Sequence, residues 1–163
     1  MPFPARVPAI VATLLLLGMQ SAAADPALRH RDQAHGQFEI HTWVDTPLRD
    51  LPGGTRMKTT ATTQTFRGGI TGSGGSDSVA VVRPDGTSQF TGYVRVTGRV
   101  GGRDGSFLLE VRGGFDGTAA RSTWKVVPGT GSDGLTGLRG EGGHVATSDA
   151  WPFVTYTLTY RFE

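Results

Sequence analysis

Six side chains in the folded part of the sequence have the chemistry of a ligand site. They are Glu39, His41 and Trp43 on one predicted strand, Glu110 and Arg112 on a second, and Trp124 on a third. If these faces line the interior of a barrel, they form a pocket with a few polar groups, as small-molecule sites do. Otherwise Glu110 and Arg112 form a surface salt bridge worth under about 1 kcal/mol, and the two tryptophans fill the core. The second interpretation is the simpler one.

The sequence predicts no catalytic residue. His41 and His144 are the histidines of the folded part. Either has the chemistry of a general base, but an isolated histidine on a strand is more often a partly exposed side chain. The nucleophile motif G-x-S-x-G of serine hydrolases is absent, and no helix is predicted to position such a serine.

No cofactor or metal site is predicted either. Gly129–Gly134 matches G-x-G-x-x-G, but a dinucleotide fingerprint must open a helix, and the glycine-rich residues that follow do not favour one. This match is interpreted as a turn. His30, Asp32 and His35 could be described as a metal cluster, yet three ligands on a flexible leader give weak affinity at best.

Residues 37–163 predict an all-β domain. From Gln37 the sequence alternates, with Phe38, Ile40, Thr42 and Val44 on one face, and about eight strands follow at roughly ten-residue spacing. Gly74–Asp77 is predicted to be a turn. Hairpin signals between successive strands favour a single antiparallel, mostly up-and-down barrel of eight strands, wide enough for side chains or one small ligand.

The first 36 residues differ from the rest. Arg6, an apolar run from Val7 to Met19 and the small residues up to Ala24 are typical of a secretory signal peptide, 1–24, cleaved after Ala24. About 12 apolar residues are too few for a spanning helix, so we expect no transmembrane segment after cleavage, and a secreted or periplasmic protein. Uncleaved retention as an anchor is the alternative. Residues 25–36 are predicted to be a flexible leader.

Composition narrows the choice of partners. Without the predicted signal peptide the formal net charge is +1, and lysines and arginines do not cluster. The sequence therefore shows no basic segment that would indicate binding to nucleic acid. It contains no cysteine, which excludes disulfides, thiol catalysis and a cysteine lipid anchor. A homo-oligomer is compatible with the sequence.

Several segments in chain order resemble domain-of-unknown-function family 3224. They are Gly36-Gln37-Phe38, Thr42-Trp43, Gly101–Phe107, Trp124–Gly129, Leu135–Gly142 and Tyr156–Tyr160. Members of this family are small bacterial proteins whose fold is similar to the allene oxide cyclase barrel. The resemblance implies an eight-stranded barrel and no assigned activity.

The chain also departs from that family pattern. An acidic residue commonly stands where this sequence has Val94, and another where it has Gly134, with Asp133 one place earlier. If either carboxylate served a shared chemistry, this chain lacks it. The signal peptide is also unusual for the family and suggests an exported branch.

Three functions remain as hypotheses. The first is binding of a small apolar or amphipathic molecule inside the barrel. The second, by analogy of fold alone, is an enzyme of cyclase or isomerase type, which requires a buried carboxylate or histidine with a perturbed pKa in the lumen. The third is a structural or partner-binding role in the envelope, which light scattering would test.

Overall fold

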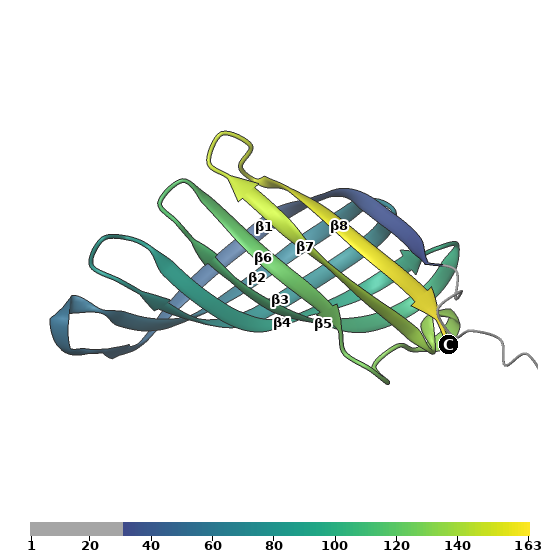
Figure 1. Cartoon of the computed structure of the whole chain (residues 1–163), viewed down its shortest axis with the longest axis horizontal. Helices are drawn as coiled ribbons and strands as arrows, with labels where there is room; N and C mark the ends of the chain where they lie inside the picture. Colours follow the sequence, from purple (N-terminus) through teal and green to yellow (C-terminus); the bar gives the residue numbers. More distant parts are fainter. Residues whose placement is uncertain (1–30) are drawn as a thin grey trace, which may run out of the picture.

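The computed structural model describes residues 31–163, which form a closed eight-stranded barrel (Figure 1). In chain order the elements are β1 (Asp32–Asp50), the 3-10 turn η2 (Pro52–Gly54), β2 (Arg56–Gly68), β3 (Ile70–Val82), β4 (Ser88–Val100), β5 (Arg103–Phe115), β6 (Ala119–Val126), the 3-10 turn η3 (Asp133–Leu135), β7 (Leu138–Thr147) and β8 (Phe153–Phe162). Each strand pairs antiparallel with the next, and β8 closes the barrel on β1. The predicted up-and-down barrel is confirmed.

The barrel begins earlier than the predicted boundary at residue 37. Asp32 to Gly36 belong to β1, where Asp32 is in register with Tyr160 of β8 and Ala34 is buried. Those five residues of the predicted leader are therefore part of the barrel wall, because each of them pairs with a residue of β8, from Tyr160 to Tyr156. The predicted signal peptide and residues 25–30 of the predicted leader lie outside the described residues.

A second correction concerns Gly74–Asp77, which is strand and not a turn. β3 runs without interruption from Ile70 to Val82. A Cβ on Gly74 would lie 2.7 Å from the ring of Phe66 on the neighbouring strand. The glycine leaves room for a large aromatic ring in the lumen, so it reflects interior packing and not a reversal of the chain.

One end of the barrel is filled with side chains. Buried residues here include Ile70, Val100, Phe107 and Leu158, together with Leu135 from η3, which is fully buried. The Tyr156 hydroxyl accepts a hydrogen bond from the Ile70 amide at 2.7 Å and so ties β8 to the start of β3. Figure 1 shows η3 at the end of the barrel where the chain terminates.

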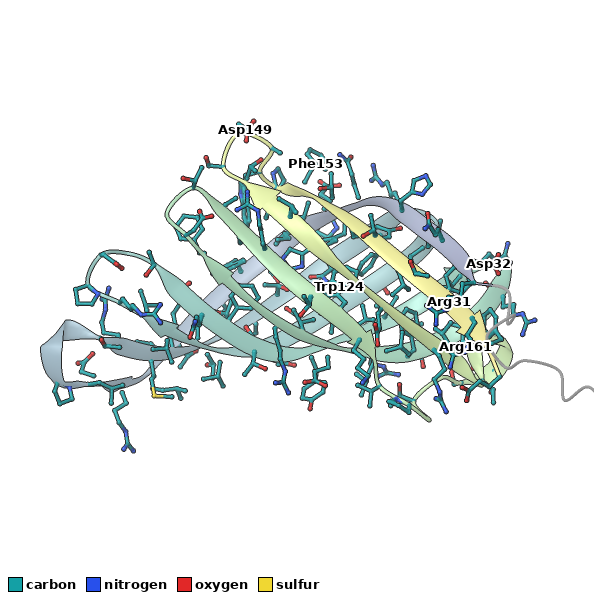
Figure 2. All side chains as sticks on the ribbon, viewed as in Figure 1. Arg31, Asp32, Trp124, Asp149, Phe153 and Arg161 are labelled. Carbon is teal, nitrogen blue, oxygen red and sulfur yellow. The ribbon has the colours of Figure 1, made fainter. Side chains whose placement is uncertain are left out.

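The opposite end carries the hairpins β1–β2, β3–β4, β5–β6 and β7–β8 (Figure 1). Figure 2 places Trp124 in the middle of the barrel, between the hairpin that holds Asp149 and the end that holds Arg161. From Trp124 towards the hairpins, side chains no longer fill the lumen and a cavity opens. This is where the candidate site lies.

Candidate functional site

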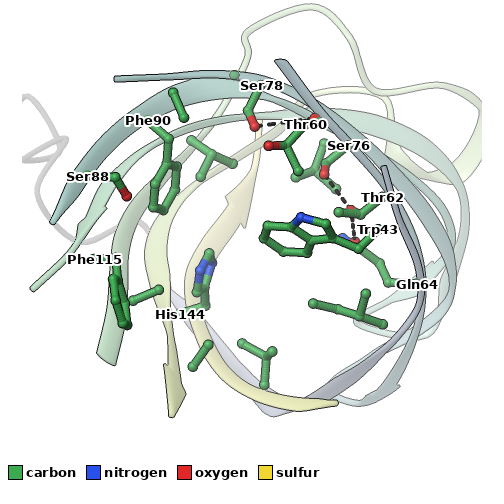
Figure 3. Close-up of a pocket in the computed structure, with 18 of the residues that line it drawn as sticks. Trp43, Thr60, Thr62, Gln64, Ser76, Ser78, Ser88, Phe90, Phe115 and His144 are labelled. Atoms are coloured by element: carbon green, nitrogen blue, oxygen red, sulfur yellow. Dashed lines mark hydrogen bonds between the residues drawn. The ribbon is translucent and has the colours of Figure 1, made fainter. Parts of the chain in front are cut away.

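The cavity has a volume of about 420 Å³, within the range of small-molecule sites. Its lining comes from all eight strands and from the loops at the hairpin end. It has two chemically different walls (Figure 3). β2 and β3 contribute amide and hydroxyl groups, namely Thr60, Thr62, Gln64, Ser76 and Ser78, whereas the other strands contribute mostly rings and aliphatic groups, among them Phe38, Phe90, Val94, Val111, Phe115, Trp124, Ala146 and Val154.

The polar wall follows from the alternation of β2. Thr60, Thr62 and Gln64 are buried, and the residues between them are exposed, because successive strand residues point to opposite faces. They are the buried polar side chains of the described residues, and each is hydrogen-bonded. Thr62 donates to the Gln64 amide oxygen at 2.9 Å and also shares a 2.6 Å bond with Ser76 of β3.

The apolar wall is a cluster of aromatic rings around His144 of β7. The imidazole meets the ring of Phe38 edge-on, with centroids 5.7 Å apart, and stacks on Phe90 at 6.4 Å. Trp124 lies 5.6 Å from it. Aromatic pairs at these separations contribute beyond the area that they bury, so the imidazole is held in one place.

His144 is the ionisable group of this wall. Its Nδ1 lies 3.1 Å from the indole Nε1 of Trp124 and 2.7 Å from the Ser122 hydroxyl. Desolvation by burial lowers the pKa of His144 from 6.5 to about 4. The imidazole is therefore neutral at pH 7, and the site can offer it as a hydrogen-bonding group or as a weak base, not as a cation.

The mouth carries an aromatic pair and an ion pair. Trp43 and Trp151 meet edge-to-face with centroids 5.8 Å apart, and each is about half exposed. The Asp45 carboxylate accepts from Lys58 at 2.6 Å and from Thr60 at 2.7 Å. Desolvation raises the pKa of Asp45, but the hydrogen bonds from Lys58, Thr60 and Trp43 and the charge of Lys58 together outweigh it, so the pKa is lowered.

A β-bulge divides the first group of predicted site residues. Ile40 is in register with Gln64 and Thr42 with Thr63, so His41 is an extra residue without a partner on β2. The bulge reverses the alternation. Trp43 projects into the lumen (Figure 3). His41, by contrast, is exposed, and its Nε2 atom forms a hydrogen bond with the Thr65 hydroxyl at 2.8 Å.

The remaining four predicted residues also separate. Glu39 lies 3.5 Å from Arg67, whose side chain is mostly exposed. Glu110 and Arg112 form a 2.6 Å ion pair on the outer face of β5, as the simpler interpretation expects. Trp124 is buried at the base of the cavity. The structure therefore brings Trp43 and Trp124 to the cavity and leaves Glu39, His41, Glu110 and Arg112 outside it.

Two cavity residues, Gln64 and His144, were not among the six predicted ligand-site residues, although His144 was considered as a general base. Their signal was phase: Gln64 is two residues from the buried Phe66, and His144 is six residues from Leu138, a fully buried residue of the same strand. Apolar residues an even number of positions away on a strand lie on the same face and so mark the inward one. Among the described residues no group of three His, Cys, Asp or Glu side chains could hold a metal ion.

A family model described as "Protein of unknown function (DUF3224)" matches residues 34–160. The chain belongs to the DUF3224 family. A crystal structure of a DUF3224 protein of unknown function from Shewanella oneidensis MR-1 is similar to it, with 25% sequence identity and a TM-score of 0.68, covering 82% of this chain and 98% of that one. No curated protein matches.

For this DUF3224 protein, the membership accounts for the barrel but brings no assigned activity with it. Val94 lines the cavity, so the apolar wall has a valine at that point. In the described part of the chain, no helix is long and apolar enough to cross a membrane.

Proposed function

We propose that this protein binds a small apolar or amphipathic molecule in the barrel cavity. The observation that carries the proposal is the two-sided lining: rings and aliphatic groups on one wall, hydroxyls and an amide on the other, around about 420 Å³. Burial of apolar area on the first wall supplies affinity, and the few oriented polar groups on the second supply selectivity.

We propose also that the protein is exported. The support is in the sequence: Arg6, the apolar run from Val7 to Met19 and the A-x-A pattern that ends at Ala24. The mature protein recovered from expression in a bacterial host should begin at Asp25 in its N-terminal sequence. Recovery of the full-length chain in the cytoplasm would contradict export.

The binding proposal is tested by filling the cavity. Ala146 lines it, and Val145, the next residue of β7, is exposed on the outside. We expect the neutral fluorescent probe N-phenyl-1-naphthylamine to bind the mature protein, and Ala146→Phe to weaken that binding at least tenfold because the new ring occupies the cavity.

The matched control is Val145→Phe, which adds a ring on the same strand but on the outer face. It should bind the probe as the unmodified protein does. Equal losses in the two variants, or no binding to the unmodified protein, would contradict the proposal.

A second candidate function is favoured by one observation, the neutral, desolvated imidazole of His144 at the cavity wall. An enzyme of cyclase or isomerase type needs a group of this kind in the lumen. Turnover of a molecule bound in the cavity, lost on His144→Gln while binding persists, would distinguish an enzyme from a binding protein.

A further inference from the structure

Gln64 contributes a hydrogen-bond donor to the polar wall of the cavity. Thr62 has a single hydroxyl proton and gives it to the Gln64 amide oxygen, so the 2.6 Å bond between Thr62 and Ser76 must be donated by Ser76. These hydroxyls hold the Gln64 side chain in one orientation, in which its amide oxygen already accepts a hydrogen bond. The Gln64 Nε2 group, with two N–H donors, is left without a hydrogen-bond partner among residues 31–163.

On the opposite wall, hydrogen bonds likewise determine which ring nitrogen of His144 carries the proton. An indole N–H can only donate, so the contact from Trp124 requires a lone pair on His144 Nδ1. In the neutral imidazole the proton is then on Nε2. The contact with Ser122 is also made to Nδ1, and Nε2 has no hydrogen-bond partner in the described part of the chain.

Both nitrogens open onto the cavity. Within the described residues, the one buried side-chain nitrogen or oxygen without a hydrogen-bond partner is Arg161 Nε, which lies elsewhere. Gln64 Nε2 and His144 Nε2 are therefore not sealed in the protein, and both side chains line the cavity (Figure 3). The interior thus presents oriented N–H donors whose partner must come from the ligand.

The charges around the cavity oppose an anionic ligand. Among the described lining residues Lys58 is the one cation, and its ammonium group already binds Asp45 at 2.6 Å at the mouth. A carboxylate in the interior would lose its water without gaining a counter-ion, which is costly. A neutral acceptor bears no such cost.

We propose that the cavity binds neutral carbonyl compounds, such as ketones, esters or amides with an apolar body, whose carbonyl oxygens accept hydrogen bonds from Gln64 Nε2 and His144 Nε2. This inference rests on the proposed function and names its ligand class. The apolar wall takes the hydrocarbon part, and the donors select the oxygen.

The test compares three fluorescent naphthalenes by direct titration at pH 7. They are 6-propionyl-2-dimethylaminonaphthalene, a neutral ketone; 6-propyl-2-dimethylaminonaphthalene, the same skeleton without oxygen; and 6-dimethylamino-2-naphthoate, a carboxylate. We expect the ketone to bind roughly tenfold more tightly than the hydrocarbon and also more tightly than the carboxylate. Its emission in the complex should be red-shifted from that in alkane solvent, because its carbonyl is hydrogen-bonded.

Variants then assign the donors. Gln64→Met and His144→Met should each reduce the preference for ketone over hydrocarbon roughly threefold and leave the hydrocarbon affinity nearly unchanged. His144→Gln, which keeps both an acceptor and a donor, should retain the preference. Thr63→Val and Val145→Met change the outer faces of the same strands and serve as controls.

The outcomes separate the two proposals. If ketone and hydrocarbon bind equally, or if the carboxylate binds best, the inference is wrong and the binding function stands. If none of the three binds, the proposed function fails and the inference with it. Should a methionine variant not fold, the affinities and the ketone emission of the unmodified protein still decide the question.

Discussion

We expect acidification from pH 7 to pH 4 to lower the free energy of unfolding by about 3 kcal/mol through His144 alone. The pKa of this imidazole is about 4 in the folded protein, against 6.5 for an exposed histidine, and each pH unit is worth about 1.4 kcal/mol. Between these two values the unfolded chain binds a proton that the folded chain does not. Stability therefore rises with pH across this window, is complete above about pH 6.5 and is lost as the pH falls to about 4.

The neighbours of His144 do not offset this loss. The rings packed on it are those of Phe38, Phe90 and Trp124, and its register partners are Ser122 of β6 and Tyr156 of β8. Burial raises the pKa of Tyr156 further above 10, outside the window. The charged groups at the cavity, Asp45 and Lys58, lie on other strands and pair with each other.

Urea unfolding at pH 7, 5.5 and 4.5, followed by tryptophan fluorescence, checks this expectation. The control is His144→Gln, which cannot titrate and should lose less stability over the same range. The carboxyl groups with lowered pKa values, such as that of Asp45, are present in both proteins. Their contribution to the pH dependence therefore cancels in the comparison. Parallel pH profiles for the two proteins would refute the assignment to His144.

Replacing Phe66 with alanine should cost about 3–5 kcal/mol of unfolding free energy. The ring is 1% exposed and contacts three others, with centroids 5.2 Å from Phe38, 6.4 Å from Trp124 and 5.7 Å from Tyr156. These rings come from β1, β6 and β8, so Phe66 joins opposite walls. Its loss leaves a void that the closed barrel cannot collapse to fill.

The measurement is again the urea unfolding free energy at pH 7. Phe153→Ala removes the same ring from β8, where it is 42% exposed, and should cost well under half as much. If the two alanine variants lose the same stability, the aromatic cluster is not the interior support described above.

How far the sequence predicts this protein is clearest on β2 and β1. The alternating burial of Thr60, Thr62 and Gln64 is seen in the structure, whereas the sequence of β2 indicates a strand only through its many threonines. On β1 the prediction from alternation breaks at His41. A bulge is one residue that the partner strand does not match, and that partner, Gly68 to Arg56, is a different segment of chain.

The same distinction applies to the glycines. A turn is predicted at Gly74 because glycine is common in turns. In the barrel, however, this glycine leaves room for the ring of Phe66. Only the register of β2 against β3, which sets Gln64 opposite Gly74, shows that the ring needs this space. A local sequence pattern does not include the neighbouring strand.

The sequence by itself determined the all-β class, most of the hairpin turns and the family, since alternation and turn residues are local properties of the chain. The tertiary structure decided which faces point inward. It placed Glu39, His41, Glu110 and Arg112 outside the cavity and brought Gln64 and His144 into it. The physical reason is closure: a strand face becomes a lumen only when β8 pairs with β1, and that pairing joins the two ends of the domain.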